Sequence, residues 1–406
     1  MLPIVITGLG VVTPFGTSTD AFAGALASGR SAVVPLTQFD TGGCSARCAA
    51  SVADFDAARW IPPMKARRMD MTSQYAMGAV CQALDAAAFA YGGDPQESTG
   101  VAVGTYTGGG SRTEEFLEGL FRLGPIGAPA MLFNATVANV AASLIGLELK
   151  LRGPNITVSN KEVSALTAVA HAYDLLRGGQ ARAIVTAGVD ALYPLFFRVH
   201  DHFGVLSHEN GQPEGSRPFD ESRNGFVLGE GAYAMVMEPV DAARLRDAPV
   251  LAEILAIECG GSSTGINQWP TRSADLARVM RRALDAGGLA PEDVDVVYAT
   301  ANSSPNLDGM EAAAIGEVFA ACRPIVTSVK GALGESSASG MASVVAAILC
   351  GRLGHVPPVA GLRHVDPACA HLNLAIEPMP VRGPIALVNG VASGGALVAI
   401  VLRLLR

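Results

Sequence analysis

Residues Ser216–Gly231 read SRPFDESRNGFVLGEG, inside a long irregular segment (203–231) that is rich in Gly, Pro, Asp and Glu. Four charged residues stand among its apolar residues and glycines: Arg217, Asp220, Arg223 and Glu230. We expect them to be buried ion-pair and capping groups that hold a structural loop, rather than reacting groups. The apolar run Ala232–Glu238 follows and predicts a strand.

Outward from this segment, apolar β-branched runs alternate with Ala-rich stretches along the whole chain, which predicts an α/β fold. Towards the N-terminus, the predicted strands are Pro3–Val12, Gly100–Tyr106, Gly153–Ser159 and Ala181–Asp190, and the predicted helices are Thr17–Ser28, Met71–Phe89, Ala135–Leu147 and Val163–Arg177. Towards the C-terminus, the pattern restarts with strands Val250–Gly260 and Val294–Ala301 and helices Ser273–Ala286 and Gly309–Ala320, and Pro324–Val329, Ala338–Cys350 and Pro384–Leu404 complete it. We therefore expect two similar halves, residues 1–245 and 246–406, in one packed body.

Composition excludes several classes of protein. Of the 406 residues, 50% are hydrophobic and 16% are charged, which supplies a large core and excludes a disordered chain. The net charge of −8 argues against nucleic-acid binding. The most apolar runs are short or interrupted, and the N-terminus has no basic region, so we expect a cytoplasmic protein with no membrane span or signal peptide.

Cysteine and histidine spacing does not predict a metal site. The seven cysteines are an odd number, and Cys44 and Cys48 have no second pair of ligands near them, so we expect free thiols. His200 and His202 form an H-x-H pair without an evident third ligand. We expect neither a metal nor a cofactor.

Five segments together resemble the β-ketoacyl-acyl-carrier-protein synthases. Besides Ser216–Gly231, they are VITGLGVVTPFG (residues 5–16), GPNITVSNKEVSALTAVAHA (153–172), DVVYATANSSPNLDGMEAAAIGEVF (295–319) and VTSVKGALGESSASGMAS (326–343). The resemblance runs from Ile4 to about Val401. It implies a thiolase-like fold, in which two five-stranded mixed sheets form five αβαβα layers.

The resemblance also places the family's reacting groups, and all three are replaced. Active members carry a nucleophilic Cys at a helix N-terminus, where the free N–H groups stabilise a thiolate, and that place falls on Glu162. Two family histidines fall on Thr300 and Glu335, whereas the family Lys is retained as Lys330. Thr has no imidazole, and an ionised Glu accepts a hydrogen bond where a donor is required. We therefore expect no catalytic residue.

Three losses on an intact scaffold resemble the chain-length factors, which pair with an active ketosynthase in type II polyketide synthases. Many of those proteins carry Gln where this chain has Glu162, and two carboxylates would repel an anionic malonyl group unless one is protonated or paired. We expect Glu162, Glu335 and Lys330 to lie close together, with Lys330 between the two carboxylates. The alternative is that one Glu points to solvent.

The resemblance places a dimer interface beside the acyl pocket, with strands near Asn155–Asn160 paired across it. Large side chains there would limit the length of a growing chain, and the candidates are Phe116, Leu120, Phe121, Met131, Leu132 and Phe133. Taken singly, each of these residues also fits an ordinary interface core. Active homologues gate the tunnel with a Phe before Gly-Gly; here that place is Ser393, before Gly394-Gly395, so the gate is absent.

The expected partners are a catalytic ketosynthase and an acidic acyl carrier protein. The densest basic cluster, Lys65, Arg67 and Arg68, is a docking candidate, and a solvated helix start explains it equally well. The leading hypothesis is a noncatalytic subunit of a ketosynthase heterodimer that completes the elongation tunnel for an aromatic polyketide, a polyene or an aryl polyene. The alternatives are an independent malonyl decarboxylase or hydrolase that uses Glu162 or Glu335, and an acyl-binding scaffold homodimer.

Overall fold

Strands from the whole chain form one mixed sheet. The computed structural model describes residues 2–405, and its main sheet has 11 strands in the order β12-β10-β9-β14-β15-β8-β1-β7-β6-β4-β5. The first part of the chain supplies β1 (Ile4–Val12), β4 (Thr99–Gly104), β5 (Asn155–Val158), β6 (Ala183–Asp190) and β7 (Gly231–Pro239). The second part supplies β8 (Ala252–Gly261), β9 (Val296–Tyr298), β10 (Ile325–Thr327), β12 (Asn373–Leu374), β14 (Ile385–Val391) and β15 (Ala396–Leu404). Short strands β2 (Val34–Pro35) and β3 (Cys48–Ala49) pair elsewhere, as do β11 (His355–Val356) and β13 (Met379–Pro380).

The two parts repeat one pairing pattern. In the first, β4 lies parallel to β5 and β6, and β7 is antiparallel to β6 and β1. In the second, β9 lies parallel to β10 and β14, and β15 is antiparallel to β14 and β8. The two parts join where Ile4–Ile6 pairs with Ala252–Ile254, so the main sheet is continuous and not divided into the two separate five-stranded sheets that were expected. The division at residue 245 stays a prediction.

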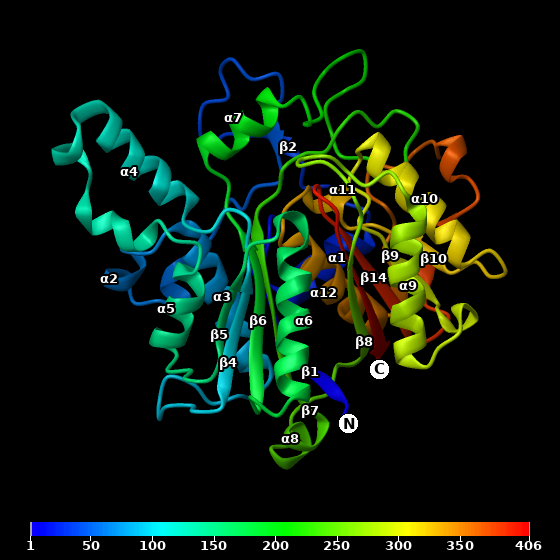
Figure 1. The fold of residues 1–406 in the computed structure, drawn as a ribbon, viewed down its shortest axis with the longest axis horizontal. Coiled ribbons are helices and arrows are strands. Elements are labelled where there is room, and N and C mark those ends of the chain that lie inside the picture. Colours follow the sequence, from blue (N-terminus) through cyan, green and yellow to red (C-terminus); the bar gives the residue numbers. More distant parts are fainter. Residues whose placement is uncertain (1, 406) are drawn as a thin grey trace.

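Helices cover both faces of each half. They are α1 (Thr19–Ala27), α2 (Pro63–Ala66), α3 (Met71–Ala86), α4 (Gly110–Leu123), α5 (Val140–Glu148), α6 (Ser164–Arg177), α7 (Pro194–His202), α8 (Val240–Leu245), α9 (Ser273–Gly287), α10 (Pro305–Val318), α11 (Lys330–Leu333) and α12 (Ser339–Arg352). Helices α3 and α5 cover the outer face of the first half, α9 and α10 cover that of the second, and α6 and α12 lie between the halves (Figure 1). This five-layer order confirms the expected thiolase-like fold.

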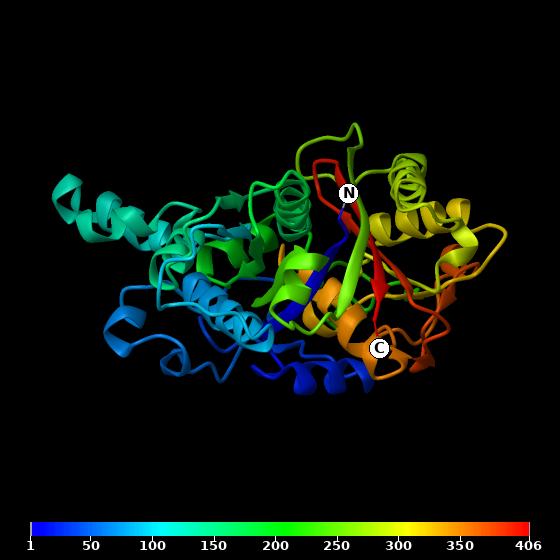
Figure 2. The same cartoon turned by 90° about the horizontal axis from the view of Figure 1, so that it is seen from below.

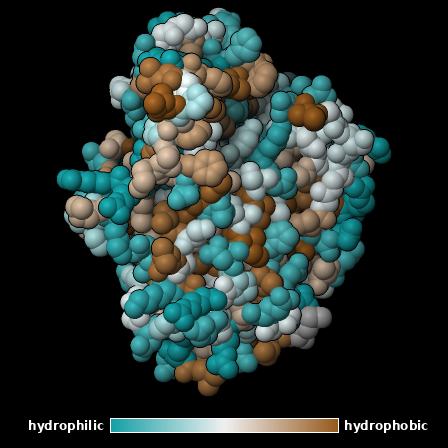
Figure 3. Space-filling view, turned by 60° about the vertical axis from the view of Figure 1, so that its left-hand side comes forward, coloured by the Kyte–Doolittle hydropathy of each residue, from teal (hydrophilic) through white to brown (hydrophobic). Residues whose placement is uncertain are grey.

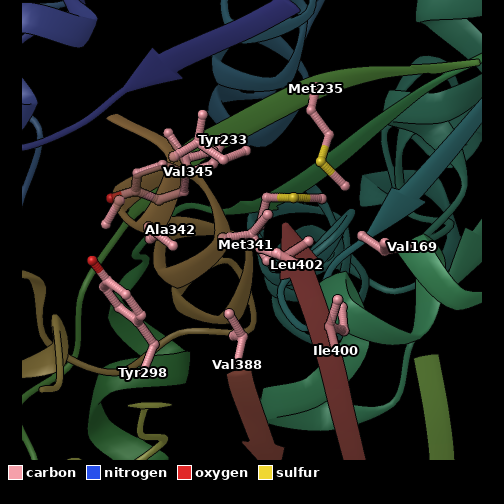
Figure 4. Packing of buried hydrophobic residues seen from close by; sticks show 14 of the residues in the cluster. Val169, Tyr233, Met235, Tyr298, Met341, Ala342, Val345, Val388, Ile400 and Leu402 are labelled. Atoms are coloured by element: carbon pink, nitrogen blue, oxygen red, sulfur yellow. The ribbon is translucent and has the colours of Figure 1, made fainter. Parts of the chain in front are cut away.

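Alternating side chains of the strands fill the two sides of each sheet. Tyr233, Met235 and Met237 of β7 belong to the central core, whereas Ala232, Ala234 and Val236 belong to the outer core under α3. β15 alternates in the same way between the central core and the core under α9. Figure 4 shows the central layer, where Met341 and Val345 of α12 lie among residues of both sheets. Burial on both faces explains why the strands read as continuous apolar runs.

Most of the predicted elements are present, with shifted ends. The predicted helix Ala135–Leu147 is wrong at its start, because residues 130–135 form a 3-10 turn and α5 begins at Val140. Five helices were not predicted: α2, α4, α7, α8 and α11. No side chain of helix α4 is fully buried, and the helix projects from the body as an arm (Figure 2). Within residues 2–405, no helix combines the length and the apolar character that crossing a membrane requires.

Candidate functional site

Glu162 lies at the entrance to α6, where the chain leaves β5. Residues Lys161–Val163 form a 3-10 turn, and Lys161 has a φ of 50°. The turn packs tightly on the end of β4: a Cβ atom at Gly104 would lie 2.3 Å from the carbonyl oxygen of Ser164, so only glycine fits there. This approach fixes the start of α6 and places the Glu162 side chain inside the protein, where it is 8% exposed.

The Glu162 carboxylate is bound by the loop between β14 and β15. The backbone N–H of Ser393 donates to Oε2 at 3.0 Å, and the Ser393 hydroxyl donates to Oε1 at 2.9 Å. Burial, followed by the charge of Glu335, raises the pKa of Glu162 to about 7. The two hydrogen bonds oppose that shift because they favour the charged form.

Lys330, Thr300 and Glu335 form a second buried group. The Lys330 ammonium lies 2.8 Å from Oε2 of Glu335 and donates to the Thr300 hydroxyl at 3.1 Å. Asn302 donates to the same Glu335 oxygen at 2.6 Å, and Ser339 donates to Oε1 at 3.2 Å. The carboxylate is therefore paired with a cation and also hydrogen-bonded, as a buried charge requires.

The structure brings together part of the predicted trio. Lys330 pairs with Glu335, but Glu162 is held by Ser393, so the prediction that Lys330 lies between the two carboxylates is wrong in that respect. The alternative, a Glu that points to solvent, is also wrong, because both side chains are buried. The sequence could not reveal the partner of Glu162, because Ser393 lies 231 positions away.

Two further carboxylates hold the backbone around Thr300. Glu311 accepts from the N–H groups of Thr300 and Ala301 at 3.0 and 2.7 Å, and Asp308 accepts from those of Phe219 and Asn302, each at 2.9 Å. Burial raises the pKa of Glu311 to about 7 and that of Asp308 to about 6. Both residues fasten the loop that carries Thr300.

The loop at residues 216–231 is largely held as expected. Arg223 lies 2.6 Å from Asp366 and 3.6 Å from Asp308, which makes it the buried ion-pair residue. Asp220 and Glu230 accept backbone N–H groups, as capping residues do. Arg217 differs from the expectation, since its guanidinium donates to the carbonyl oxygen of Pro213.

A cavity of about 360 Å³ opens above Glu162. Its lining combines polar with aromatic and aliphatic side chains: Tyr106, Glu162, Val199, His200, Phe203, Val205, Phe226, Ile266, Asn267, Gln268, Trp269 and Ser393. Of the positions where the resemblance places reacting groups, Glu162 contributes to this lining, while Thr300, Lys330 and Glu335 do not. Glu335 does not line the cavity, but it lies close enough for its charge to raise the pKa of Glu162.

Sequence reasoning missed the aromatic wall of this cavity. The rings of Phe196 and His200 lie 4.3 Å apart, and Tyr106 packs edge-on to Phe196 at 5.2 Å. His200 lies within this wall rather than at the surface, and burial lowers its pKa. The dense aromatic run at residues 193–197 was the available signal. Among the described residues, no group of three or more His, Cys, Asp or Glu could hold a metal ion.

The candidates for length control lie on the projecting arm, which comprises α4 and residues 124–139. Phe121, Met131 and Phe133 are 80%, 91% and 61% exposed, and Phe116 packs near Phe133 with 6.1 Å between ring centroids. Leu120 and Leu132 are half-buried. Apolar side chains gather on this arm and on the face below it (Figure 3). An exposed apolar surface of this kind is typical of an interface.

The basic candidates lie in and just after α2. Lys65, in α2, forms an ion pair with Glu148 at the end of α5, and Arg67 and Arg68 are exposed. Their cluster is accessible, but the ion pair neutralises part of its charge. The role of this cluster as a docking surface remains a prediction.

Comparison with known proteins gives consistent similarities along the chain. Residues 1–243 match the family model for the β-ketoacyl synthase N-terminal domain, and residues 251–363 match that for the C-terminal domain. The tetracenomycin polyketide synthase ketoacyl synthase beta subunit of Streptomyces glaucescens is 34% identical over 99% of this chain and 98% of its own. The 3-oxoacyl-[acyl-carrier-protein] synthase 2 of Coxiella burnetii is 32% identical, with 90% of each chain covered. The solved ishigamide ketosynthase/chain length factor has 28% identity, a TM-score of 0.92 and full coverage of both chains.

Proposed function

Because this chain belongs to the β-ketoacyl synthase family, we propose that it is the noncatalytic, chain-length-determining subunit of a ketosynthase heterodimer in type II polyketide biosynthesis. In this role it pairs with a catalytic ketosynthase and completes the tunnel in which the chain on an acyl carrier protein is elongated. The product belongs to the aromatic polyketides, polyenes or aryl polyenes.

One observation carries the proposal: all three reacting positions are filled by groups that cannot perform the family's reaction. Glu162 has no nucleophilic sulfur, and its carboxylate is bound by Ser393. Glu335 accepts from Lys330 and Asn302, where the reaction needs a donor to the thioester enolate. Elongation therefore requires a Cys and histidines from another subunit.

The surface supports the need for a partner. Strand β5 ends the sheet, with one side of its backbone unpaired, and the arm beside it carries exposed apolar side chains. A free strand edge and an apolar surface are both costly in water and are usually covered. The similarity to a polyketide ketoacyl synthase beta subunit, over nearly the full length of both chains, supports an active ketosynthase as that partner.

A carrier protein is the second proposed partner. The Coxiella burnetii relative is named as a synthase that acts with an acyl carrier protein, and acyl carrier proteins are acidic. Arg67 and Arg68 give this chain an exposed basic surface for such a partner.

One observation favours a second function, that of an independent decarboxylase or hydrolase of malonyl thioesters. Glu162 lines a cavity, and its pKa of about 7 suits proton transfer at neutral pH. In this function, the purified chain would consume malonyl-carrier protein without a ketosynthase.

Co-expression with a catalytic ketosynthase tests the proposal. Size exclusion with mass detection should give a one-to-one complex, and the complex should elongate malonyl units while neither chain does so alone. Phe133→Ala and Phe116→Ala should lengthen the products, whereas Arg152→Ala, on the surface outside the arm, should not. A stable homodimer that does not bind the ketosynthase would contradict the proposal, and malonyl consumption by the chain alone would favour the second function.

A further inference from the structure

A second cavity, of about 550 Å³, lies where two loops meet, and it shares no lining residue with the cavity above Glu162. Residues 212–222 form one side of it and residues 361–364 form the other. The loops are tied to each other, because the N–H of Glu221 donates to the carbonyl oxygen of His364 at 2.8 Å and Asp220 forms an isolated β-bridge with Val365. The fold therefore holds the two walls of this cavity in place.

Arg217 is a buried cation in this lining that has no carboxylate partner. Its side chain is only 8% exposed, and its guanidinium donates to the carbonyl oxygen of Pro213. Within residues 2–405, no carboxylate lies within 4.0 Å of this guanidinium. Its remaining N–H groups donate to no protein atom in that range and are still reached by solvent, which places them at the surface of the cavity. A buried charge without a partner is costly, so this one is suited to bind an anion.

Two further cationic or donor groups lie beside Arg217. Arg363 and His364 line the opposite wall, and the described part of the chain gives neither side chain a hydrogen bond or an ion pair. Burial lowers the pKa of Arg217, the charge of Asp220 opposes this shift, and the charge of Arg363 adds to it. Arg363 is thus near enough to repel Arg217, and an anion between the two would relieve the repulsion.

Three carboxylates also line the cavity, and backbone N–H groups occupy two of them. Asp220 Oδ2 accepts from the N–H groups of Arg363 and His364, each at 2.8 Å, and Glu214 Oε1 accepts from those of residues 47 and 48 at 2.8 and 2.7 Å. Glu221 is exposed, and its carboxylate has no partner among the described residues. Glu221 is therefore the carboxylate that is free to oppose an anion in the cavity.

We propose that this cavity binds the phosphate monoester of a small molecule, with the phosphate between Arg217 and Arg363 and with His364 as a further donor. A guanidinium donates two parallel N–H bonds to a phosphate, and two guanidiniums match its double charge. The volume of the cavity lies in the range of small-molecule sites and exceeds what a phosphate ion alone would fill, so the ligand carries an organic group. This site goes beyond the proposed function and does not depend on it.

Isothermal titration calorimetry of the full chain with phenyl phosphate tests the site. The wild type should bind with a saturable heat, and Arg363→Gln should weaken binding at least about tenfold, because one of the two cations is lost. Arg363 is exposed and unpartnered, so this variant should fold as the wild type does. The matched control is Arg352→Gln, at the end of α12, which removes an exposed arginine outside the cavity and should leave binding unchanged. Glu221→Gln should tighten binding, because it removes the free carboxylate.

Two other probes define the ligand class. Benzoate has the same ring and a single charge, and it should bind at least about tenfold more weakly than phenyl phosphate. Inorganic phosphate should compete with phenyl phosphate but bind more weakly. The site is overturned if the wild type gives no saturable heat with phenyl phosphate, or if Arg363→Gln binds it as tightly as Arg352→Gln does. Benzoate binding as tight as that of phenyl phosphate would overturn the choice of phosphate, and equally tight binding of inorganic phosphate would overturn the organic group.

These outcomes are separate from those that test the proposed function. Neither the arm nor β5 contains the substituted residues, so the variants should form the one-to-one complex as the wild type does. If the chain does not bind a ketosynthase, the proposed function fails, and the calorimetry still reports on the site. If the complex forms and Arg363→Gln binds phenyl phosphate as the control does, the site alone fails.

Discussion

Replacing Lys330 by Met should strongly destabilise the protein. The substitution removes the ammonium 2.8 Å from Glu335, and both side chains are at most 3% exposed. Asn302 and Ser339 still donate to the carboxylate, but no positive charge remains bonded to it. Removing one partner of a buried ion pair costs about 3–5 kcal/mol, because the other charge stays buried. We expect a loss in that range at neutral pH.

Equilibrium unfolding in urea, followed by circular dichroism, measures this loss as a shift of the midpoint at constant slope. The control is Arg152→Met, which breaks an ion pair with Glu97 whose side chains are 59% and 71% exposed, and which should cost less than about 1 kcal/mol. The double variant Lys330→Met/Glu335→Gln should recover much of the stability, because it leaves no charge uncompensated. The reasoning is refuted if Lys330→Met costs no more stability than the control. It is also refuted if the stability lost in the double variant equals the sum of the losses in the two single variants.

Three other predictions follow from the geometry. The pKa of Glu162 is about 7 in the folded protein, against an ordinary value of 4.5, so the stability that this group contributes is full below pH 4.5 and is lost as the pH rises through 7. Between pH 5 and pH 8, the free energy of unfolding in urea should therefore fall by up to about 3 kcal/mol more in the wild type than in Glu162→Gln. Gly229→Ala places a Cβ atom 2.0 Å from the Leu333 carbonyl oxygen and should lower the melting temperature sharply, whereas Gly309→Ala, where nothing lies within 4 Å, should not. Ile126 is 96% exposed on the arm, so Ile126→Glu should leave the melting temperature of the isolated chain unchanged. The same substitution should abolish co-purification with the ketosynthase, and an intact complex would show that the arm is not the interface.

The α/β class was predictable from local patterns, and the resemblance to a known family implied the thiolase-like fold. Burial on both faces makes each strand a continuous apolar run, and the loop at Ser216–Gly231 has a distinctive arrangement of charged residues and glycines. These signals depend on neighbouring residues, so they are readable without coordinates. The arm was missed as a helix because none of the α4 side chains is fully buried.

The replacement of the reacting groups was also readable from sequence, because each lies at a fixed distance from a motif. Glu162 stands nine positions after Gly153, and Glu335 five positions after Lys330. The sequence therefore determined the absence of Cys and His at these positions. It also determined that Lys330 and Glu335 are near each other in the chain.

Only the tertiary structure decided how those residues are used. The pairing of Lys330 with Glu335 alone, the two bonds from Ser393 to Glu162, and the packing of Tyr106 on Phe196 and His200 each depend on how separate loops meet. Such contacts are set by the register of the strands that carry the loops, and a change of one residue in register would point each side chain elsewhere. Local sequence patterns therefore specify the α/β class of this protein, whereas the contacts that hold Glu162, Lys330 and Glu335 are a property of the assembled fold.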